Sequence, residues 1–159
     1  MSTNEQLGMK LEILKVKMSE LVPHEGILDW HLKEIVDQMQ KDGYQLRPIA
    51  VSKLDSLGEK WKGRYLIHDG HHRTAALKKL GLDMIMISIF DFKSPRIKVF
   101  DYNDMSIVVP KEEVIRRATS GIEVTPRYDK HYIEINGKLE SFHNNDVIEP
   151  ITRTSFSEL

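Results

Sequence analysis

Six consecutive residues, His68 to Arg73, place one carboxylate, three imidazoles and a guanidinium next to one another. Residues 64–67 before them, Arg-Tyr-Leu-Ile, are typical of a strand, and the residues after them, up to Gly81, are typical of a short helix. The first turn of a helix offers unpaired backbone N–H groups and the positive end of the helix dipole, which together bind phosphate. Arg73 can add two parallel hydrogen bonds to phosphate oxygens. The motif therefore predicts a phosphate-binding active centre.

The residues of this motif have distinct predicted roles. Because His71 and His72 are successive, their rings cannot face the same way on a helix, so we expect one to meet phosphate and the other to pack or hold a loop. His68 lies at the end of the predicted strand. It is equally compatible with a position in the core and with a position behind the residues that contact the ligand. The predicted nucleotide-binding residues at this helix start are Gly70, His71, His72, Arg73 and Thr74.

Asp69 immediately precedes the predicted helix, where three uses are open to it. Aspartate at this position most often caps the helix. Beside phosphates, its carboxylate can instead hold a magnesium ion or take a proton. A zinc site made from His68, Asp69, His71 and His72 is a further alternative, but their order matches no zinc-hydrolase spacing, and a structural zinc is disfavoured without cysteine.

The composition limits the classes of protein to consider. A chain of 159 residues with 40% hydrophobic residues forms one domain with a core, and residues 1–9 are expected to be a flexible N-terminus. The 23 basic and 24 acidic side chains nearly cancel, which argues against a nucleic-acid partner. The chain has no cysteine and no long apolar run, so we expect a cytoplasmic protein without disulfides or a membrane span.

Strand and helix patterns alternate along the chain. Apolar runs predict strands at 10–18, 48–51, 64–67 and 84–90, and residues 95–101 form a loop or a short strand. Helical spacing indicates helices from Asp29, as N-cap, to Gly43, over 70–80, and over 111–120 with Gly121 as the stop. Asn136-Gly137 between two apolar runs predicts a hairpin. The predicted fold class is α/β (α+β), with one mixed sheet flanked by helices.

Several of these segments together resemble the ParB/sulfiredoxin superfamily. The resemblance runs through residues 21–25, 47–51 and 69–73, and covers roughly residues 10–131, leaving a hairpin and tail at 132–159. The Asp-Gly-His-His-Arg form is most similar to the free serine kinases, which phosphorylate L-serine with ADP or ATP to give O-phospho-L-serine. A second block, Asp101-Tyr102 followed by residues 109–115, resembles the same kinases.

The resemblance implies a set of roles for individual residues. Glu25 is the implied base that takes the proton of the serine hydroxyl, and Asp69 the implied catalytic residue and Mg²⁺ ligand. Arg47 either reaches the phosphate or caps a strand. ADP or ATP and Mg²⁺ are the implied cofactors. The residues suggested to contact the serine or its phosphate are Asp101, Tyr102, Arg127, Lys130 and His131; a solvated charged turn is equally compatible with the last three.

Other functions and roles remain open at this point. One is a ParB-like nucleotide-binding module, associated with DNA or regulatory, that has no kinase activity; against a partition protein, no helix-turn-helix pair follows the motif. A sulfiredoxin-like reductase is excluded because that chemistry needs a cysteine thiol. The two tryptophans, Trp30 and Trp61, are expected to pack in the interior rather than to stack on adenine.

Overall fold

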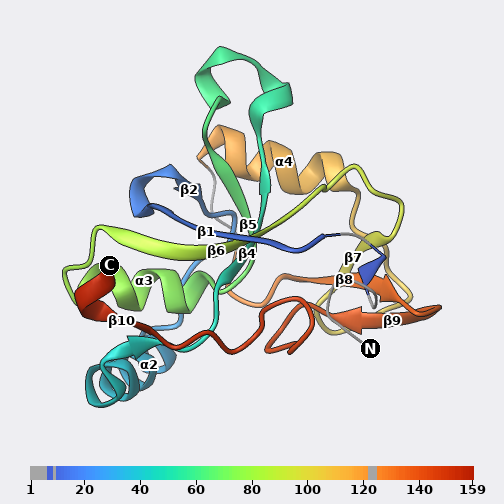
Figure 1. Ribbon diagram of the computed structural model, residues 1–159. Helices are drawn as coiled ribbons and strands as arrows, with labels where there is room; N and C mark the ends of the chain where they lie inside the picture. The colour runs from blue at the N-terminus through green and yellow to red at the C-terminus, as the bar shows by residue number, and fades with distance from the viewer. Residues whose placement is uncertain (1–6, 9, 122–124) are drawn as a thin grey trace.

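A five-stranded mixed sheet forms the centre of the computed structural model, which describes residues 7, 8, 10–121 and 125–159 (Figure 1). The neighbouring pairs are antiparallel, parallel, antiparallel and parallel across the sheet. In spatial order the strands are β1 (Glu12–Lys17), β6 (Met84–Phe90), β4 (Ile49–Lys53), β5 (Tyr65–Asp69) and β2 (Leu21–Val22). This sheet confirms the predicted fold class and the strands predicted around residues 10–18, 48–51, 64–67 and 84–90.

A second, antiparallel sheet, which the sequence did not predict, is not joined to the first by strand pairing in the described residues. It joins β7 (Ile97–Asp101), β8 (Asp129–Ile135) and β9 (Lys138–Ser141). The turn between β8 and β9 is the predicted one: Asn136 and Gly137 have φ of 51° and 76°, which suits a tight hairpin. Since β8 begins at Asp129, residue 131, at which the resemblance to the kinases ends, lies within this strand. A small pair, β3 (Tyr44–Gln45) and β10 (Thr154–Ser155), ties the C-terminal end to α2.

The helices follow the predicted segments with one correction. Asp29 is the first helical residue rather than the cap: the N-cap position is Leu28, and it has no side-chain capping bond. Gly43 and Gly121 end their helices in the left-handed conformation, as predicted. The helices are α2 (Asp29–Asp42), α3 (His71–Lys79) and α4 (Lys111–Ser120), with 3₁₀ turns η1 (Met18–Glu20), η2 (Asp55–Leu57), η3 (Glu59–Trp61) and η4 (Phe156–Glu158).

Each face of the five-stranded sheet has its own core. Alternation along the strands sends Ile49, Val51 and Ile67 to the face that α2 and α3 cover. Ala50 and Leu66 point to the other face, where they pack with residues of α4 and of the second sheet (Figure 1). His68 follows the alternation of Leu66 and is buried on this second face, which is one of the two positions the sequence left open for it.

Both ends of the described chain contribute to the interior. Leu7, inside the segment expected to be flexible, is fully buried in the second core; residues 1–6 and 9 of that segment lie outside the described residues. At the other end, Glu149 is completely buried, and its Oε2 accepts hydrogen bonds from Arg73 Nη2 at 2.7 Å and from the Ala50 N–H at 3.1 Å. No helix in the described part of the chain has the length and apolarity that crossing a membrane requires.

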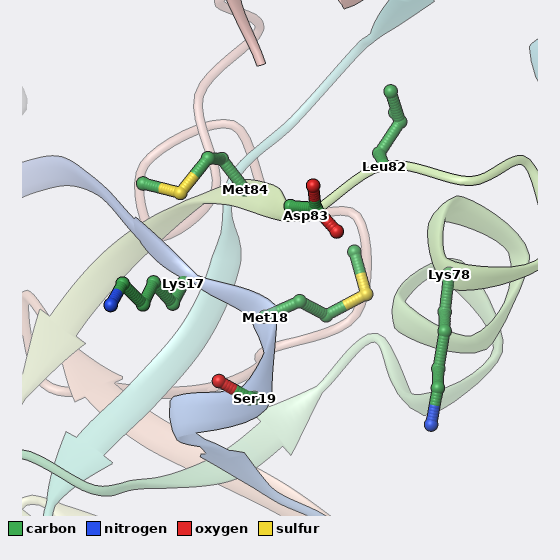
Figure 2. Close-up of a pocket in the computed structure, with 7 residues that line it drawn as sticks. All are labelled: Lys17, Met18, Ser19, Lys78, Leu82, Asp83 and Met84. Atoms are coloured by element: carbon green, nitrogen blue, oxygen red, sulfur yellow. The ribbon is translucent and has the colours of Figure 1, made fainter.

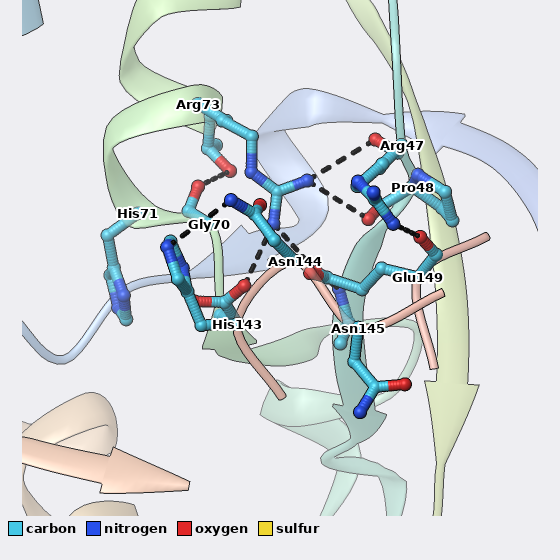
Figure 3. A network of polar contacts seen from close by, with 12 residues as sticks. Arg47, Pro48, Gly70, His71, Arg73, His143, Asn144, Asn145 and Glu149 are labelled. Atoms are coloured by element: carbon cyan, nitrogen blue, oxygen red, sulfur yellow. Dashed lines mark hydrogen bonds and ion pairs between the residues drawn. The ribbon is translucent and has the colours of Figure 1, made fainter. Parts of the chain in front are cut away.

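Arg73 is the centre of this anchor (Figure 3). Its guanidinium also donates to Asp69 Oδ2 at 3.0 Å and lies 3.4 and 3.3 Å from the carbonyl oxygens of Arg47 and Pro48. Burial alone would raise the pKa of Asp69, but the hydrogen bond from His143 and the charge of Arg73 hold it well below its usual range. Burial raises the pKa of Glu149 despite Arg73. The group therefore balances one guanidinium against one ionised carboxylate.

The Arg73 anchor generates a prediction about stability. Replacing Glu149 by alanine leaves the buried Ala50 N–H without a partner and removes one acceptor of the buried Arg73 guanidinium, so we expect a loss of about 3 kcal/mol in the free energy of unfolding. The matched control is Asp146→Ala, which removes an 80% exposed carboxylate 2.8 Å from Arg47 in the same tail and should cost about 1 kcal/mol or less. Urea denaturation measures both; equal losses would contradict the anchor.

Candidate active site

The turn from β5 into α3 has the backbone geometry of an anion site. Gly70 has a φ of 103°, and a Cβ built on it would lie 2.6 Å from Ile49 Cδ1, so only glycine fits there. Thr74 bonds back to the Gly70 carbonyl through its N–H and its hydroxyl, both at 2.8 Å. The first N–H groups of a helix have no acceptor within the helix, which leaves those at this start to face a ligand.

His71 and His72 both hold the loop between β2 and α2. Nε2 of His71 accepts a hydrogen bond from the His24 N–H at 3.2 Å, and Nε2 of His72 accepts one from the Leu28 N–H at 2.9 Å. The sequence predicts such a role for one ring and a phosphate contact for the other, whereas the structure uses both rings on the loop. The loop that carries Glu25 is therefore fixed at its two ends to the first turn of α3.

These contacts require neutral imidazoles. Burial lowers the pKa of His71 to about 4, and burial together with the nearby His31 and Arg127 lowers the pKa of His72. An imidazole that accepts at Nε2 while neutral carries its proton on Nδ1. Nδ1 of His71 lies 3.9 Å from Glu25 Oε2. The ring therefore presents its N–H edge toward the predicted base.

Glu25 is held in a partly buried position with a proton affinity suited to acid–base chemistry. Its side chain is 14% exposed, and Oε1 accepts a hydrogen bond from the Asp129 N–H at 3.2 Å. Burial and the charge of the Asp129 carboxylate raise the pKa of Glu25 to about 8, and the charge of Asp69 contributes in the same direction. A carboxyl group that titrates near neutral pH is typical of a general base or acid.

Asp129 is the partner of Glu25 that sequence reasoning missed. Its Oδ2 accepts from Arg117 Nη1 at 3.0 Å, and its Oδ1 lies 3.2 Å from His131 Nε2. Burial would raise the pKa of Asp129, but His131 and the neighbouring polar groups outweigh it and keep the pKa below its usual range. The two carboxyls thus divide into a protonatable one and an ionised one. The sequence feature that could have indicated Asp129 is its spacing from His131, because residues two apart in a strand lie on the same face.

Asp69 and Arg47, which the sequence predicts near the metal ion and the phosphate, both contact the C-terminal tail. Asp69 lies at the end of β5, 3.4 Å from Nδ1 of the exposed His143, and is not a helix cap. Arg47 donates to the Glu149 carbonyl at 2.8 Å and pairs with Asp146. Phosphate contact by either Arg47 or Arg73 stays a prediction. Nothing in the spacing of His143 or Glu149 marks them as members of this group.

Of the predicted substrate residues, His131 and Asp101 lie beside the Glu25–Asp129 pair. His131 is buried next to Asp129, and Asp101 is the cross-strand partner of Asp129 in the β7–β8 pairing. Lys130 lies on the opposite face of β8, with its ammonium 5.9 Å from the ring centre of Tyr102. The structure therefore separates Lys130 from the predicted base.

Arg127 and Trp30 stand at the other side of the loop. Trp30 is 57% exposed, so the expectation that it packs in the interior is wrong; Trp61 does pack against the second core. The Arg127 guanidinium lies 5.7 Å from the Trp30 ring centre, and its charge reaches His72. An exposed indole, a cation and the first turn of α3 thus share one region.

A hollow of about 480 Å³ lies away from the turn between β5 and α3 (Figure 2). Its lining comes from the end of β1, the beginning of η1, the Lys78 end of α3 and the segment entering β6. Since Gly70 begins α3 and Lys78 is close to its end, this hollow is distinct from the predicted phosphate site. The zinc alternative also finds no support, because the one group of metal-ligand type in the described ranges omits His68, Asp69, His71 and His72.

Comparison with known proteins identifies the family of the chain. The ParB N-terminal domain model matches residues 1–100. The "ATP-dependent L-serine kinase" of Desulfurococcus mucosus is 34% identical over 89 residues, which are 56% of this chain and 33% of that protein. The "ADP-dependent L-serine kinase SerK" of Thermococcus kodakarensis is 28% identical over 115 residues, 72% of this chain and 46% of that protein. The chain spans less than half the length of these curated relatives.

A solved structure shares the fold over nearly the whole chain. It is a "free serine kinase in complex with AMP", with a TM-score of 0.73, 17% identity and 94% coverage of both chains. A likeness at this identity concerns the fold. At 94% coverage it extends beyond the residues that the family model matches.

The low pKa of His71 generates a prediction about pH. As the pH falls from about 6.5 toward about 4, the unfolded chain binds this proton and the folded chain does not, so the free energy of unfolding decreases by about 1.4 kcal/mol per pH unit for this group. In His71→Gln, whose amide oxygen can still accept from the loop, that contribution to the slope should vanish. Urea titrations between pH 4 and 6.5 measure it. An unchanged slope in His71→Gln would contradict the assignment.

Proposed function

The chain belongs to the family of ParB N-terminal domains, and from this premise we propose that it is a small-molecule kinase. It transfers a phosphoryl group from ADP or ATP to the hydroxyl of free L-serine, giving O-phospho-L-serine. The names of the curated relatives and the fold shared with a free serine kinase support this proposal. The cytoplasm as the location and the absence of a nucleic-acid partner stay predictions.

One observation carries the proposal. A carboxyl group with its pKa raised to about 8, that of Glu25, is fixed by two imidazoles to the first turn of a helix that can bind phosphate. Phosphoryl transfer depends on positioning and on stabilising charge more than on covalent participation of the protein. A base held at a phosphate site is the arrangement that this reaction needs.

The reaction follows from these positions. The free N–H groups at the start of α3 bind the phosphates of the donor nucleotide, and Glu25 in its ionised form accepts the proton of the serine hydroxyl as that oxygen attacks the terminal phosphorus. The bond from this phosphorus to the bridging oxygen breaks, and AMP or ADP leaves. Asp129 stays ionised beside Glu25 and keeps the affinity of Glu25 for the proton high.

The residues present fit a nucleotide and a magnesium ion. Gly70 has no side chain, so Ile49 and Arg73 can lie against its backbone at the helix start, where the N–H groups that would bind phosphate begin. Mg²⁺ is usually held by one or two carboxylates and by substrate phosphates, and Asp69 at the end of β5 is the carboxylate in position to hold it. When bound, the ion supplies neutralisation of phosphate charge. The proposed role of Arg127, which lies beside His72 and Trp30, is to orient the donor or the carboxylate of serine.

The direct experiment is phosphorus NMR of the protein with Mg²⁺ and L-serine, and with ADP or ATP in separate tubes. We expect a growing O-phosphoserine signal, and the productive tube identifies the donor. If neither tube gives a signal while calorimetry on the same sample detects nucleotide binding, the kinase proposal is wrong, and a nucleotide-binding module without kinase activity is the better description.

Removing the proposed base tests its role. Glu25→Gln keeps the shape of the side chain but cannot accept the proton, so we expect kcat for serine phosphorylation to fall by about 100-fold or more while the nucleotide Kd stays within a few-fold. Glu59→Gln, which changes a 90% exposed glutamate in η3, is the matched control and should retain wild-type turnover. Turnover by Glu25→Gln at the wild-type rate would rule Glu25 out as the base.

A further inference from the structure

Three ligand-type side chains meet in the interior next to Glu25. His24 comes from the loop between β2 and α2, whereas Asp129 and His131 come from one face of β8. They are 1%, 5% and 2% exposed, respectively. One ligand atom from each lies within 4.8 Å of the others. The cluster therefore joins two segments that are more than 100 residues apart in the chain.

The atoms that face one another in this cluster lack partners. His24 Nδ1, Asp129 Oδ1 and His131 Nε2 are all buried and without a hydrogen bond. The last two are 3.2 Å apart but are not aligned as a hydrogen bond. Because leaving one buried polar atom unsatisfied costs about 1–3 kcal/mol, three at one point indicate a missing ligand.

The hydrogen bond that His24 makes through Nε2 determines the protonation of its other ring nitrogen, Nδ1. Nε2 of His24 lies 3.0 Å from the Ile67 carbonyl oxygen, which can only accept, so Nε2 carries the proton. In the neutral ring Nδ1 then has a bare lone pair, and no hydrogen bond occupies it. A histidine whose second nitrogen donates to a backbone carbonyl is the usual arrangement in metal sites.

His131 has an equivalent outer contact. Its Nδ1 lies 2.7 Å from Nδ1 of His68, and Nε2 of His68 lies 2.6 Å from the Ser52 hydroxyl oxygen. When His131 donates to His68 and His68 donates to Ser52, all three groups are satisfied and Nε2 of His131 also has a bare lone pair. Asp129 has an equivalent contact, because Arg117 donates a hydrogen bond to Oδ2, the oxygen that does not face the cluster.

We propose that His24, Asp129 and His131 bind one divalent transition-metal ion of the Zn²⁺ type. Two imidazoles and a carboxylate suit Zn²⁺ and its neighbours, whereas Mg²⁺ prefers oxygen ligands. Ligands bonded to a tetrahedral ion at about 2.0–2.1 Å lie about 3.3 Å apart, close to the 3.2 Å between His131 Nε2 and Asp129 Oδ1. The ligand atom of His24 lies within 4.8 Å of the other two, so His24 completes the set by moving inward.

The ion would link the Glu25 loop to β8. His24 directly precedes Glu25, and the Asp129 N–H donates to the Glu25 carboxylate, so both neighbours of the base become metal ligands. This site is separate from the Mg²⁺ expected with the nucleotide at Asp69. The inference does not depend on the kinase proposal, because it rests on the geometry of the three side chains.

The test is metal binding by the whole chain after treatment with EDTA. Calorimetric titration with ZnCl₂ should give one site per chain, and CoCl₂ should give the visible absorption of a tetrahedral ion. We expect His131→Gln and Asp129→Asn to weaken Zn²⁺ binding by more than about 100-fold, since even outer-contact changes cost 10- to 100-fold. His31→Gln, at a histidine outside the cluster, should bind as the wild type does.

Measurements on the wild type keep the test decisive if a variant does not fold. On adding ZnCl₂, the ¹⁵N resonance of His24 Nδ1 should shift while its Nε2 keeps the proton. No binding by the wild type would overturn the proposal and leave a proton between Asp129 and His131 as the ligand. Undiminished binding in both folded variants would overturn it as well, since the ion would then sit elsewhere.

Discussion

The attachment of the Glu25 loop to the start of α3 is the constraint on which the proposed site depends. Two imidazole nitrogens, on His71 and His72, accept backbone N–H groups at the two ends of this loop. Both acceptors exist only while the rings are neutral, and burial keeps them so. These two bonds, together with the Asp129 N–H that donates to Glu25, hold Glu25 against β8 at the place where a helix dipole favours phosphate.

Electrostatic balance around this point explains why so many charged groups are buried. Arg73 and Asp69 form one neutral pair under the tail, while burial favours the neutral form of Glu149. Arg117 compensates Asp129, which in turn raises the proton affinity of Glu25. Buried charges cost several kcal/mol each unless they are paired, so every carboxylate here has either a cation or a proton. The exception is the set of unsatisfied atoms on His24, Asp129 and His131.

The sequence predicted those parts that depend on local patterns. Apolar runs indicated the main strands, glycines marked the ends of two helices, and Asn136-Gly137 marked the hairpin, because these signals act over a few residues. The β5–α3 turn was also found from its own residues. Local patterns could not reveal that Glu149 would meet Arg73, since 76 residues separate them. The exposure of Trp30 and the start of α2 at Asp29 were likewise decided by tertiary packing.

The tautomers of His71 and His72 test the central constraint most directly. Long-range ¹H–¹⁵N NMR of the folded chain at pH 7 distinguishes a proton on Nδ1 from one on Nε2. The attachment of the loop predicts neutral rings protonated at Nδ1 in both residues, because their Nε2 atoms accept hydrogen bonds. An imidazolium at either residue, or a proton on either Nε2, would contradict the account, since the Glu25 loop would then lack its anchor.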